Sequence, residues 1–446
     1  MIRSQLAEFM KRMETDSVAI ISSAREATRS NDTQYRYRQD SDFLYLTGFD
    51  EPEAIAIIAP SHHEHKFTLF VRPRDPEREI WDGRRAGVEG ARAEFGADAA
   101  FPIGEFEEKL GDLLNGATNL YYRIGNGNPD LDEAIIKRIR HLRAMGRRGA
   151  TAPQAVIDTG TIIHEMRLFK TEEEIEFMQR AADIAAEGHV EAMKTARPGM
   201  KEYEIEALVE YVFRKRGASG PAYTSIVGSG ANATILHYIN NDATLADGDL
   251  LLIDAGAEYR GYASDITRTF PVNGRFTEAQ RDIYDLVLST QVACTERVRP
   301  GQSVDELKTY SIELLTEGMV RLGLLKGDPV KLIKEEKYKQ FYMHGLGHFL
   351  GLDVHDVGRY HIKDEARRLA PGMVMTVEPG LYIAPGTKDI PGKYLGIGVR
   401  IEDDVLVTTD GNRVLSSKTP KQPEEIEELM ARAQDQERGA RVAPVL

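Results

Sequence analysis

Two ten-residue segments, far apart in the chain, share one order of apolar, polar and glycine positions. DGDLLLIDAG at residues 247–256 aligns without a gap with PGMVMTVEPG at residues 371–380. Asp254 falls on Glu378, and each acid ends an apolar run typical of a buried strand. Because an unpaired carboxylate is costly to bury, the repeat predicts a charged partner for each of these acids.

Each copy of the repeat is followed by a second acid. Asp265 lies in GYASDITRTF after Asp254, and Glu402 lies in GVRIEDDVLV after Glu378. The ten residues between Asp254 and Asp265 predict a hairpin whose ends face each other. Arg400 and Glu402 share one strand face by the strand period of two. We therefore expect four carboxylates to converge on one point from two similar halves of the chain.

The first 168 residues show alternating apolar runs and helical patterns. The runs SVAIIS, FLYLTGF, AIAIIAP and FTLFVRP predict strands, whereas GDLL and DLDEAIIKRIRHLRAM predict helices. This alternation predicts an α/β domain over residues 1–168. It contains no phosphate-binding glycine loop.

Residues 169–446 follow a different plan. Thr171 and Glu174 form a capping box before a long amphipathic helix, and a second helix ends at Gly217. A glycine-rich segment and the first acidic strand pair come next. The second half of the domain then repeats this order, with two helices, a glycine-rich segment and the second acidic strand pair. This pattern predicts an α+β domain with pseudo-twofold symmetry, in which helices pack on a sheet and the site lies on the opposite, concave face. The tail from Glu424 to Leu446 predicts one charged helix with a frayed end.

Composition limits the classes of partner. The 446 residues are 41% hydrophobic and carry a formal charge of -14, so neither nucleic acid nor an anionic membrane is expected as the main partner. The N-terminus predicts an amphipathic helix rather than a signal peptide, and no apolar stretch approaches the roughly 20 residues of a membrane span. The single Cys294 has no disulfide partner and is expected to be a buried thiol. We expect a cytoplasmic protein.

The acids and one histidine predict a metal site. His348 in HGLGHFLG is the strongest imidazole candidate, because its glycine neighbours permit close approach. Four carboxylates and one imidazole, without thiolates, suit Mn, Co or Mg better than structural zinc. With two divalent cations and a bridging hydroxide the charges sum to about minus one, which Arg400 could compensate. Two metals sharing a hydroxide supply a nucleophile and polarise a carbonyl, which is the chemistry of amide hydrolysis.

Three further histidines lie outside this ligand set. His237, His344 and His355 have glycine and other small or polar neighbours rather than an apolar helical stripe. They are candidates for proton donors or oxyanion stabilisers, and a purely structural role stays open for each.

Taken in order, these motifs resemble the pita-bread metallopeptidases, and within them the aminopeptidase P (Xaa-Pro aminopeptidase) group. The matching segments are ILHY, LLIDAGAEYRGYASDITRTFP, HGLGHFLGLDVHD, VEPGLYI and GVRIEDDVLVT. QDSDFLYLTGFDEPEAIAII and RDPEREIWDGRRAG resemble the N-terminal, creatinase-like domain of that group. The resemblance thus covers both predicted domains.

The resemblance implies a ligand set for two divalent ions. Asp254 would chelate one metal, His348 and Glu378 would hold the other, and Asp265 and Glu402 would bridge them. Manganese(II) is the metal that the resemblance favours, with Co(II) or Zn(II) as alternatives.

The resemblance also implies roles around the metals. The implied catalytic residues are His237, His344, His355, Glu378 and Arg400. The implied substrate-binding residues are His237, His355, Tyr382 and Trp81. It further implies a homodimer or homotetramer in which a neighbouring subunit contributes to the site, with Trp81 as the candidate. A core aromatic is the alternative for Trp81.

The implied activity is release of the N-terminal residue from peptides with proline in second position, by attack of a metal-bridging hydroxide on the Xaa-Pro amide. The prolyl nitrogen has no hydrogen, so selection would depend on ring shape and on a pocket that accepts a tertiary amide. Two alternatives stay open: a prolidase acting on Xaa-Pro dipeptides, and a non-catalytic pita-bread binding protein, in which the ligands are usually lost.

Overall fold

The computed structural model describes residues 2–442, which divide into two compact units, Met1–Arg167 and Leu168–Leu446. The last helix, α13, spans Pro423–Val442, as the charged tail predicts. The frayed end expected beyond that helix lies outside the described residues.

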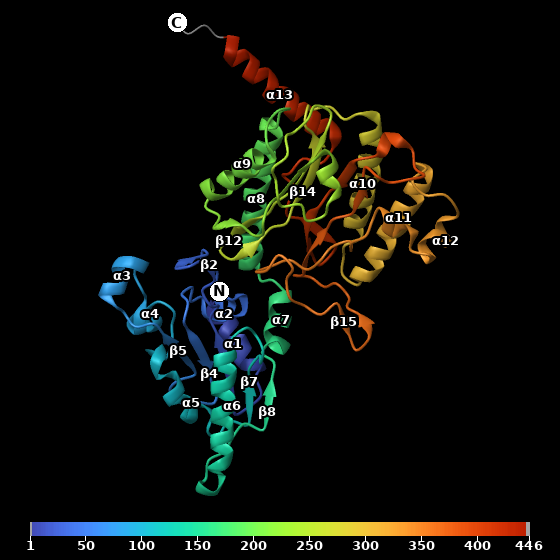
Figure 1. Cartoon of the computed structure of the whole chain (residues 1–446). Coiled ribbons are helices and arrows are strands. Elements are labelled where there is room, and N and C mark those ends of the chain that lie inside the picture. The colour runs from blue at the N-terminus through green and yellow to red at the C-terminus, as the bar shows by residue number, and fades with distance from the viewer. Residues whose placement is uncertain (1, 443–446) are drawn as a thin grey trace. The chain divides into compact units, whose positions relative to one another are not determined.

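The N-terminal unit contains a six-stranded mixed sheet in the order β6-β5-β4-β1-β7-β8 (Figure 1). β1 runs antiparallel to β4 and parallel to β7. The central strands are buried along almost their whole length, which explains their continuous apolar sequences. The strands of this unit are β1 (Ser17–Ser22), β4 (Ile55–Ile58), β5 (Phe67–Val71), β6 (Ala99–Pro102), β7 (Asn119–Tyr121) and β8 (Ala155–Ile157), with a separate hairpin of β2 (Thr28–Ser30) and β3 (Thr33–Gln34).

Helices complete this unit. Leu110, Leu114, Ile135 and Ile139 on two of these helices, α5 and α6, join the apolar core formed with the sheet. The helices are α1 (Ile2–Arg12), α2 (Ser41–Thr47), α3 (Pro76–Asp82), α4 (Gly87–Ala93), α5 (Phe106–Leu114), α6 (Pro129–Ala144) and α7 (Gly160–Leu168), with short 3-10 turns at Ile103–Glu105 and Gly146–Arg148. The unit is therefore of the α/β type expected from the alternating pattern.

The strand expected for FLYLTGF is wrong, because this segment forms helix α2. Asp40 caps the helix by accepting the Phe43 N–H at 2.9 Å, and Gly48 ends it with a φ of 64°. Phe43 and Leu46 are both fully buried. An apolar run that is buried nearly all round has no clear period of two or 3.6, so its end caps decide the outcome.

The C-terminal unit repeats one arrangement of strands. Two of its three-stranded sheets, with the orders β10-β11-β14 and β17-β20-β21, correspond to the two copies of the sequence repeat, and a third has the order β13-β12-β9. The strands are β9 (Gly220–Pro221), β10 (Ile226–Ser229), β11 (Leu250–Asp254), β12 (Ala257–Tyr259), β13 (Tyr262–Ala263), β14 (Thr267–Pro271), β15 (His361–Ile362), β16 (Glu365–Ala366), β17 (Val374–Val377), β18 (Gly380–Ile383), β19 (Ile397–Arg400), β20 (Asp403–Val407) and β21 (Asn412–Val414).

Two helix pairs flank these strands, α8 packing on α9 and α10 packing on α11 (Figure 1). The capping box of Thr171 and Glu174 begins α8, as the sequence predicts. Cys294 on α10 is a buried free thiol. The helices are α8 (Glu172–Thr195), α9 (Glu202–Lys215), α10 (Glu278–Arg297), α11 (Val304–Arg321), α12 (Pro329–Lys334) and α13, with 3-10 turns η3 (Gly230–Thr234), η4 (Lys337–Gln340) and η5 (Gly392–Tyr394). Over the described residues, every helix is too short or too polar to cross a membrane.

A buried charge cluster fixes α2 against α7 in the N-terminal unit. The Asp42 carboxylate accepts hydrogen bonds from Arg167 at 2.7 Å and from His164 at 3.1 Å. Burial alone would raise the pKa of Asp42, but His164 and Arg167 together hold this pKa below its ordinary value. A carboxyl whose pKa is lowered in the folded state stabilises that state when it is ionised.

Asp42→Asn should destabilise the N-terminal unit by about 3 kcal/mol at neutral pH, because it removes the charge that compensates a buried guanidinium. The advantage of Asp42 is fully present above about pH 4, the unfolded pKa, and is lost as pH falls through the lower folded pKa. Hydrogen exchange of the β1 amides at several pH values measures this. Glu8→Gln, which removes an exposed carboxylate paired with Arg12, is the control and should change little. Equal effects of the two variants at pH 7 would contradict the assignment.

Candidate functional site

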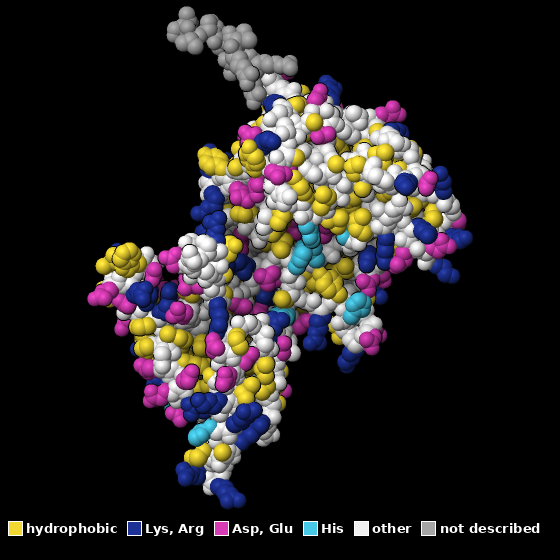
Figure 2. All heavy atoms as spheres, in the orientation of Figure 1, with side chains coloured by type: hydrophobic (Ala, Val, Ile, Leu, Met, Phe, Trp, Pro, Cys, Tyr) yellow, Lys and Arg dark blue, Asp and Glu magenta, His cyan; other side chains and the backbone are white. Residues whose placement is uncertain are grey.

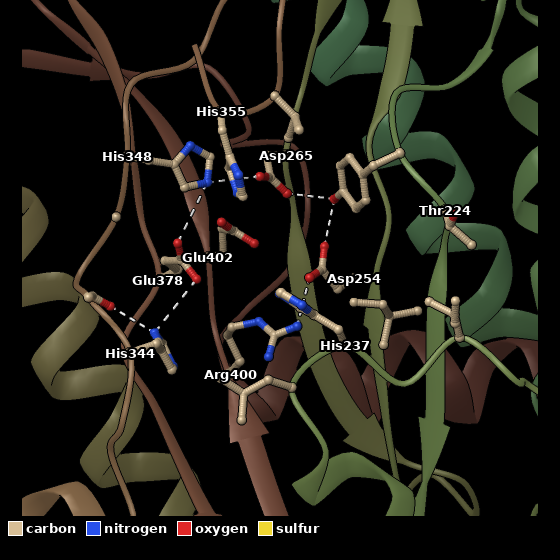
Figure 3. Close-up of a pocket in the computed structure, with 17 residues that line it drawn as sticks. Thr224, His237, Asp254, Asp265, His344, His348, His355, Glu378, Arg400 and Glu402 are labelled. Carbon is tan, nitrogen blue, oxygen red and sulfur yellow. Dashed lines mark hydrogen bonds and ion pairs between the residues drawn. The ribbon is translucent and has the colours of Figure 1, made fainter. Parts of the chain in front are cut away.

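A pocket of about 490 Å³ opens among the strands and loops of the C-terminal unit (Figure 3). Figure 2 shows histidine side chains grouped on one face of this unit, beside hydrophobic ones. The pocket brings together all five predicted metal ligands and four further candidates. These lining residues are Asp254, Asp265, His348, Glu378 and Glu402, with His237, His344, His355 and Arg400.

The two strand pairs deliver their acids in the same way. β11 pairs antiparallel with β14, and Asp254 lies opposite Thr267, the first residue of β14. Asp265 comes two residues before Thr267 and therefore lies just beyond the paired end. β17 pairs antiparallel with β20, with Val377 opposite Asp403, so Glu378 and Glu402 lie just beyond that end. Each ladder thus presents two carboxylates at one end, and the expected hairpin geometry of Asp254 and Asp265 is confirmed.

His348 faces these acids from a glycine-rich segment. Its Nε2 lies 3.3 Å from Asp265 Oδ2 and 3.7 Å from Glu378 Oε1. Its Nδ1 lies 3.0 Å from the Phe349 carbonyl oxygen, and a hydrogen bond there leaves Nε2 directed at the acids. The segment packs directly on β17: a Cβ at Gly347 would lie 2.0 Å from the Thr376 carbonyl oxygen, so only glycine fits.

The donor set fits divalent cations. Ligand atoms of Asp265, His348 and Glu402 all lie within 4.8 Å of one another. Burial raises the pKa of Asp254 and Glu402, and raises that of Glu378 to about 7; neighbouring carboxylates add to each shift. Burial opposes the charged form of His348, but Asp265 and Glu378 outweigh it and raise its pKa to about 9. Cations bound among these groups would offset both the burial and the repulsion of like charges.

Tyr223 is a site residue that the sequence did not reveal. Its hydroxyl lies 2.6 Å from Asp254 Oδ1 and 2.5 Å from Asp265 Oδ1, so a single hydroxyl is within hydrogen-bond distance of both acids. Burial raises the pKa of Tyr223 well above its ordinary value, which keeps the hydroxyl a neutral donor. Tyr223 lies outside the repeat and the acidic motifs, and only the fold brings it beside them.

Arg400 connects the acids to His344 through Tyr382. Its Nη2 donates to Asp254 Oδ2 at 2.6 Å, and its Nη1 donates to the Tyr382 hydroxyl at 2.9 Å. That hydroxyl can then donate to His344 Nε2 at 2.8 Å, while His344 Nδ1 donates to the Gly345 carbonyl at 2.7 Å. Burial, with the charge of Arg400, lowers the pKa of His344 to about 4, so this imidazole is neutral at pH 7. Tyr382 is buried behind the pocket lining, where it orients Arg400 and His344.

His355 and His237 lie on two loops around the acids (Figure 3). The His355 ring packs edge-on against His348, with centroids 4.3 Å apart, and burial lowers the pKa of His355. Its loop is anchored by the next residue, because Asp356 accepts a hydrogen bond from Lys170 at 3.0 Å in an almost fully buried ion pair. His237 is exposed on the loop that follows β10.

Trp81 belongs to the N-terminal unit, on α3, and its side chain is 84% exposed. The core aromatic that was the alternative for this residue is therefore wrong. Its neighbour Ile80 is 82% exposed.

Known proteins share both units. Residues 176–409 match metallopeptidase family M24, and residues 3–121 match the aminopeptidase P N-terminal domain. The Xaa-Pro aminopeptidase of Escherichia coli (strain K12) is 48% identical over 428 residues, which cover 96% of each chain. The Xaa-Pro aminopeptidase of Haemophilus influenzae is 46% identical over 422 residues, which cover 94% of each chain.

Solved structures agree with this. The structure of a Pseudomonas aeruginosa aminopeptidase superposes with a TM-score of 0.95 at 49% identity, over 97% of this chain and 98% of that one. Escherichia coli aminopeptidase P with the inhibitor Pro-Leu superposes with a TM-score of 0.93 at 47% identity, over the same shares. The fold and site define a two-domain metallopeptidase with a pita-bread catalytic domain. The chain belongs to metallopeptidase family M24.

A divalent ion such as manganese should stabilise the C-terminal unit, because the acids are expected to bind it when they converge in the folded chain and not in the unfolded chain. At a concentration one hundred times the dissociation constant the gain is about 2.7 kcal/mol. Asp265→Asn should weaken manganese binding at least about tenfold, since it removes a charged ligand from the cluster. Thermal unfolding with and without manganese, and metal content by mass spectrometry, measure this. Asp410→Asn, at an exposed acid, is the control. Equal metal content in the two variants would contradict the ligand assignment.

Proposed function

We propose that this protein is a metal-dependent aminopeptidase that releases the N-terminal residue from peptides with proline in second position. The observation that carries the proposal is the convergence of four carboxylates and His348 in one pocket lined by further histidines. The names of the relatives, Xaa-Pro aminopeptidases of Escherichia coli and Haemophilus influenzae, supply the substrate class.

The five ligand candidates, Asp254, Asp265, His348, Glu378 and Glu402, would hold two divalent ions. Manganese(II) is our proposal for the native metal, because the donors are mostly oxygen and include no thiolate. When bound, such ions activate water and polarise the carbonyl of the amide that is cleaved.

The protein side chains bind the peptide and move its protons. His237 and His355 lie on the loops around the acids, where their ring N–H groups can donate to the carbonyl oxygen as it becomes tetrahedral. Glu378 is the proposed proton acceptor, since its carboxylate lines the pocket beside Asp265 and Glu402, where the activated water would lie. Arg400 orients Asp254, and the Tyr382 hydroxyl can donate a hydrogen bond to His344 Nε2.

Apolar side chains offer a surface for the prolyl ring. Ile226, Leu236, Ile239 and Val354 line the pocket together with the histidines. A ring without an N–H can be recognised only by shape and apolar contact, and these residues provide both.

The resemblance supports three further proposals. Ile80 and Trp81 form an exposed apolar pair on α3, which fits a homodimer or homotetramer in which Trp81 contacts the substrate of a neighbouring subunit. Residues 1–168 and 169–446 are the proposed domains. A cytoplasmic location is the third.

The manganese-loaded protein should release the first residue of an Xaa-Pro-Yaa tripeptide at least about tenfold faster, in kcat/KM, than it cleaves the Xaa-Pro dipeptide; tenfold corresponds to about 1.4 kcal/mol in the barrier. Xaa-Ala-Yaa is the matched control and should be a poor substrate. Release of the free amino acid by chromatography measures all three. Faster dipeptide cleavage would support the prolidase alternative, and an intact tripeptide with every metal tested would overturn the proposal.

A further inference from the structure

The loop that carries His237 lies between β10 and β11 and has little regular structure beyond the short turn η3. His237 itself is exposed, as are Ile235 and Ile239 on either side. A long loop with an exposed tip is expected to be mobile unless something ties it down. A proton donor for the reaction needs a defined position, so the anchor of this loop matters.

That anchor is a buried carboxylate at the start of α9. Glu202 is 0% exposed, and no Lys, Arg or His among the described residues forms an ion pair with it. Its charge is satisfied by neutral donors alone. Oε1 accepts from the Ser229 N–H at 2.7 Å, the Ser229 hydroxyl at 2.8 Å and the Asn232 amide at 3.1 Å. Oε2 accepts from the Tyr238 hydroxyl and the Ala243 N–H, both at 2.9 Å.

The two oxygens bind opposite ends of the loop. Oε1 holds the outgoing end, at Ser229 and Asn232, and Oε2 holds the returning end, at Tyr238 and Ala243. Tyr238 directly follows His237, and its ring packs on the small core of Ile226, Ala233 and Leu252. The carboxylate therefore closes the loop across its base and fixes the residue next to His237.

A role limited to capping α9 does not account for these contacts. Glu202 is the first residue of that helix, yet its side chain accepts two of these five bonds from Ser229 at the end of β10 and the other three from the loop. Burying a carboxylate without a cation requires several donors, and hydrogen bonds to a charged group are stronger than those between neutral groups. The loop and the end of β10 supply these donors in the conformation described here, so the buried charge and this loop conformation stabilise each other.

We infer that Glu202 is a positioning residue for the reaction, acting through Tyr238 to hold His237 against the substrate. The inference rests on the proposed function for its kinetic consequence. The loop anchoring itself is a property of the folded chain and can be measured without turnover.

Two variants test the anchor. Glu202→Gln keeps the size of the side chain but replaces one oxygen by an NH2 group. That group would face a backbone N–H, which can only donate, so the hydrogen bond at that position is lost. Tyr238→Phe removes one hydroxyl and leaves the other four bonds in place. Tyr394→Phe is the matched control, because it removes a tyrosine hydroxyl bonded to a carboxylate, Asp282, at 2.7 Å on η5.

Each variant is made with His237 present and with His237→Ala. With His237 present, we expect Tyr238→Phe to lower kcat/KM about fivefold, because it removes one hydrogen bond of the anchor. Glu202→Gln should lower kcat/KM more, because it weakens several of these bonds. In the His237→Ala background both losses should shrink to less than about twofold, because there is no imidazole left to position. Tyr394→Phe should leave kcat/KM unchanged in both backgrounds.

Hydrogen exchange of peptides covering residues 229–243 is the second measurement. Both variants should exchange faster there at an unchanged rate in α10 and α11, and Tyr394→Phe should not. Equal kinetic losses with and without His237, or unchanged exchange of the loop, would overturn the inference. If Glu202→Gln does not fold, Tyr238→Phe decides the question. If the wild-type protein does not cleave Xaa-Pro-Yaa, the proposed function fails, while the exchange measurement still decides whether Glu202 holds the loop.

Discussion

The constraint on which this structure depends is the burial of four carboxylates in one pocket. Burial raises the pKa of Asp254, Glu378 and Glu402, and mutual repulsion adds to the cost. Such a cluster is stable only if cations and donors surround it. His348 at 3.3 Å from Asp265 and Arg400 on Asp254 supply part of this compensation, and divalent ions held among the acids would supply the rest. The metal site is thus also a condition for the local stability of the C-terminal unit.

One arginine joins the two halves of the catalytic unit behind the pocket. Arg268 on β14 is fully buried and donates to Asp403 Oδ1 at 2.7 Å and to the Glu402 carbonyl oxygen at 2.5 Å. Burial would raise the pKa of Asp403, but Arg268 and Lys421 hold it well below its ordinary value. The first half of the repeat therefore fixes the backbone that carries a ligand of the second half. This link explains how acids from distant segments keep a common position.

The acids and the histidines are held by different parts of the fold. Carboxylates at the ends of paired strands are positioned by the ladders themselves, which leave little freedom. His237 and His355 lie on loops, so each needs a separate anchor: Glu202 for one, and the buried pair of Lys170 and Asp356 for the other. Both anchors are buried charges without a direct part in the reaction. The acids at the strand ends and the anchored loops together give the pocket a defined geometry.

The sequence by itself determined the elements whose signals are local. The two decapeptides and the spacing of Asp254 to Asp265 predicted the acid-bearing strand pairs, and the capping box at Thr171 predicted the start of α8. These features need only neighbours in the chain, and the strand period makes their faces readable. The prediction from local pattern was wrong for FLYLTGF, because its apolar run is compatible with either a strand or a buried helix. The caps at Asp40 and Gly48 favour the helix.

Only the tertiary structure decided which polar groups share the pocket. Tyr223 meets Asp265, and Glu202 meets Tyr238 and Ala243, across separations that carry no periodic signal. Trp81, expected at a substrate site or in a core, is exposed on α3. A side chain's partner is set by how sheets and loops pack in three dimensions, and hydrogen-bond partners need no fixed spacing along the chain. The acids and the histidine that converge in the pocket were therefore predictable from the sequence, whereas the residues that hold them in place were not.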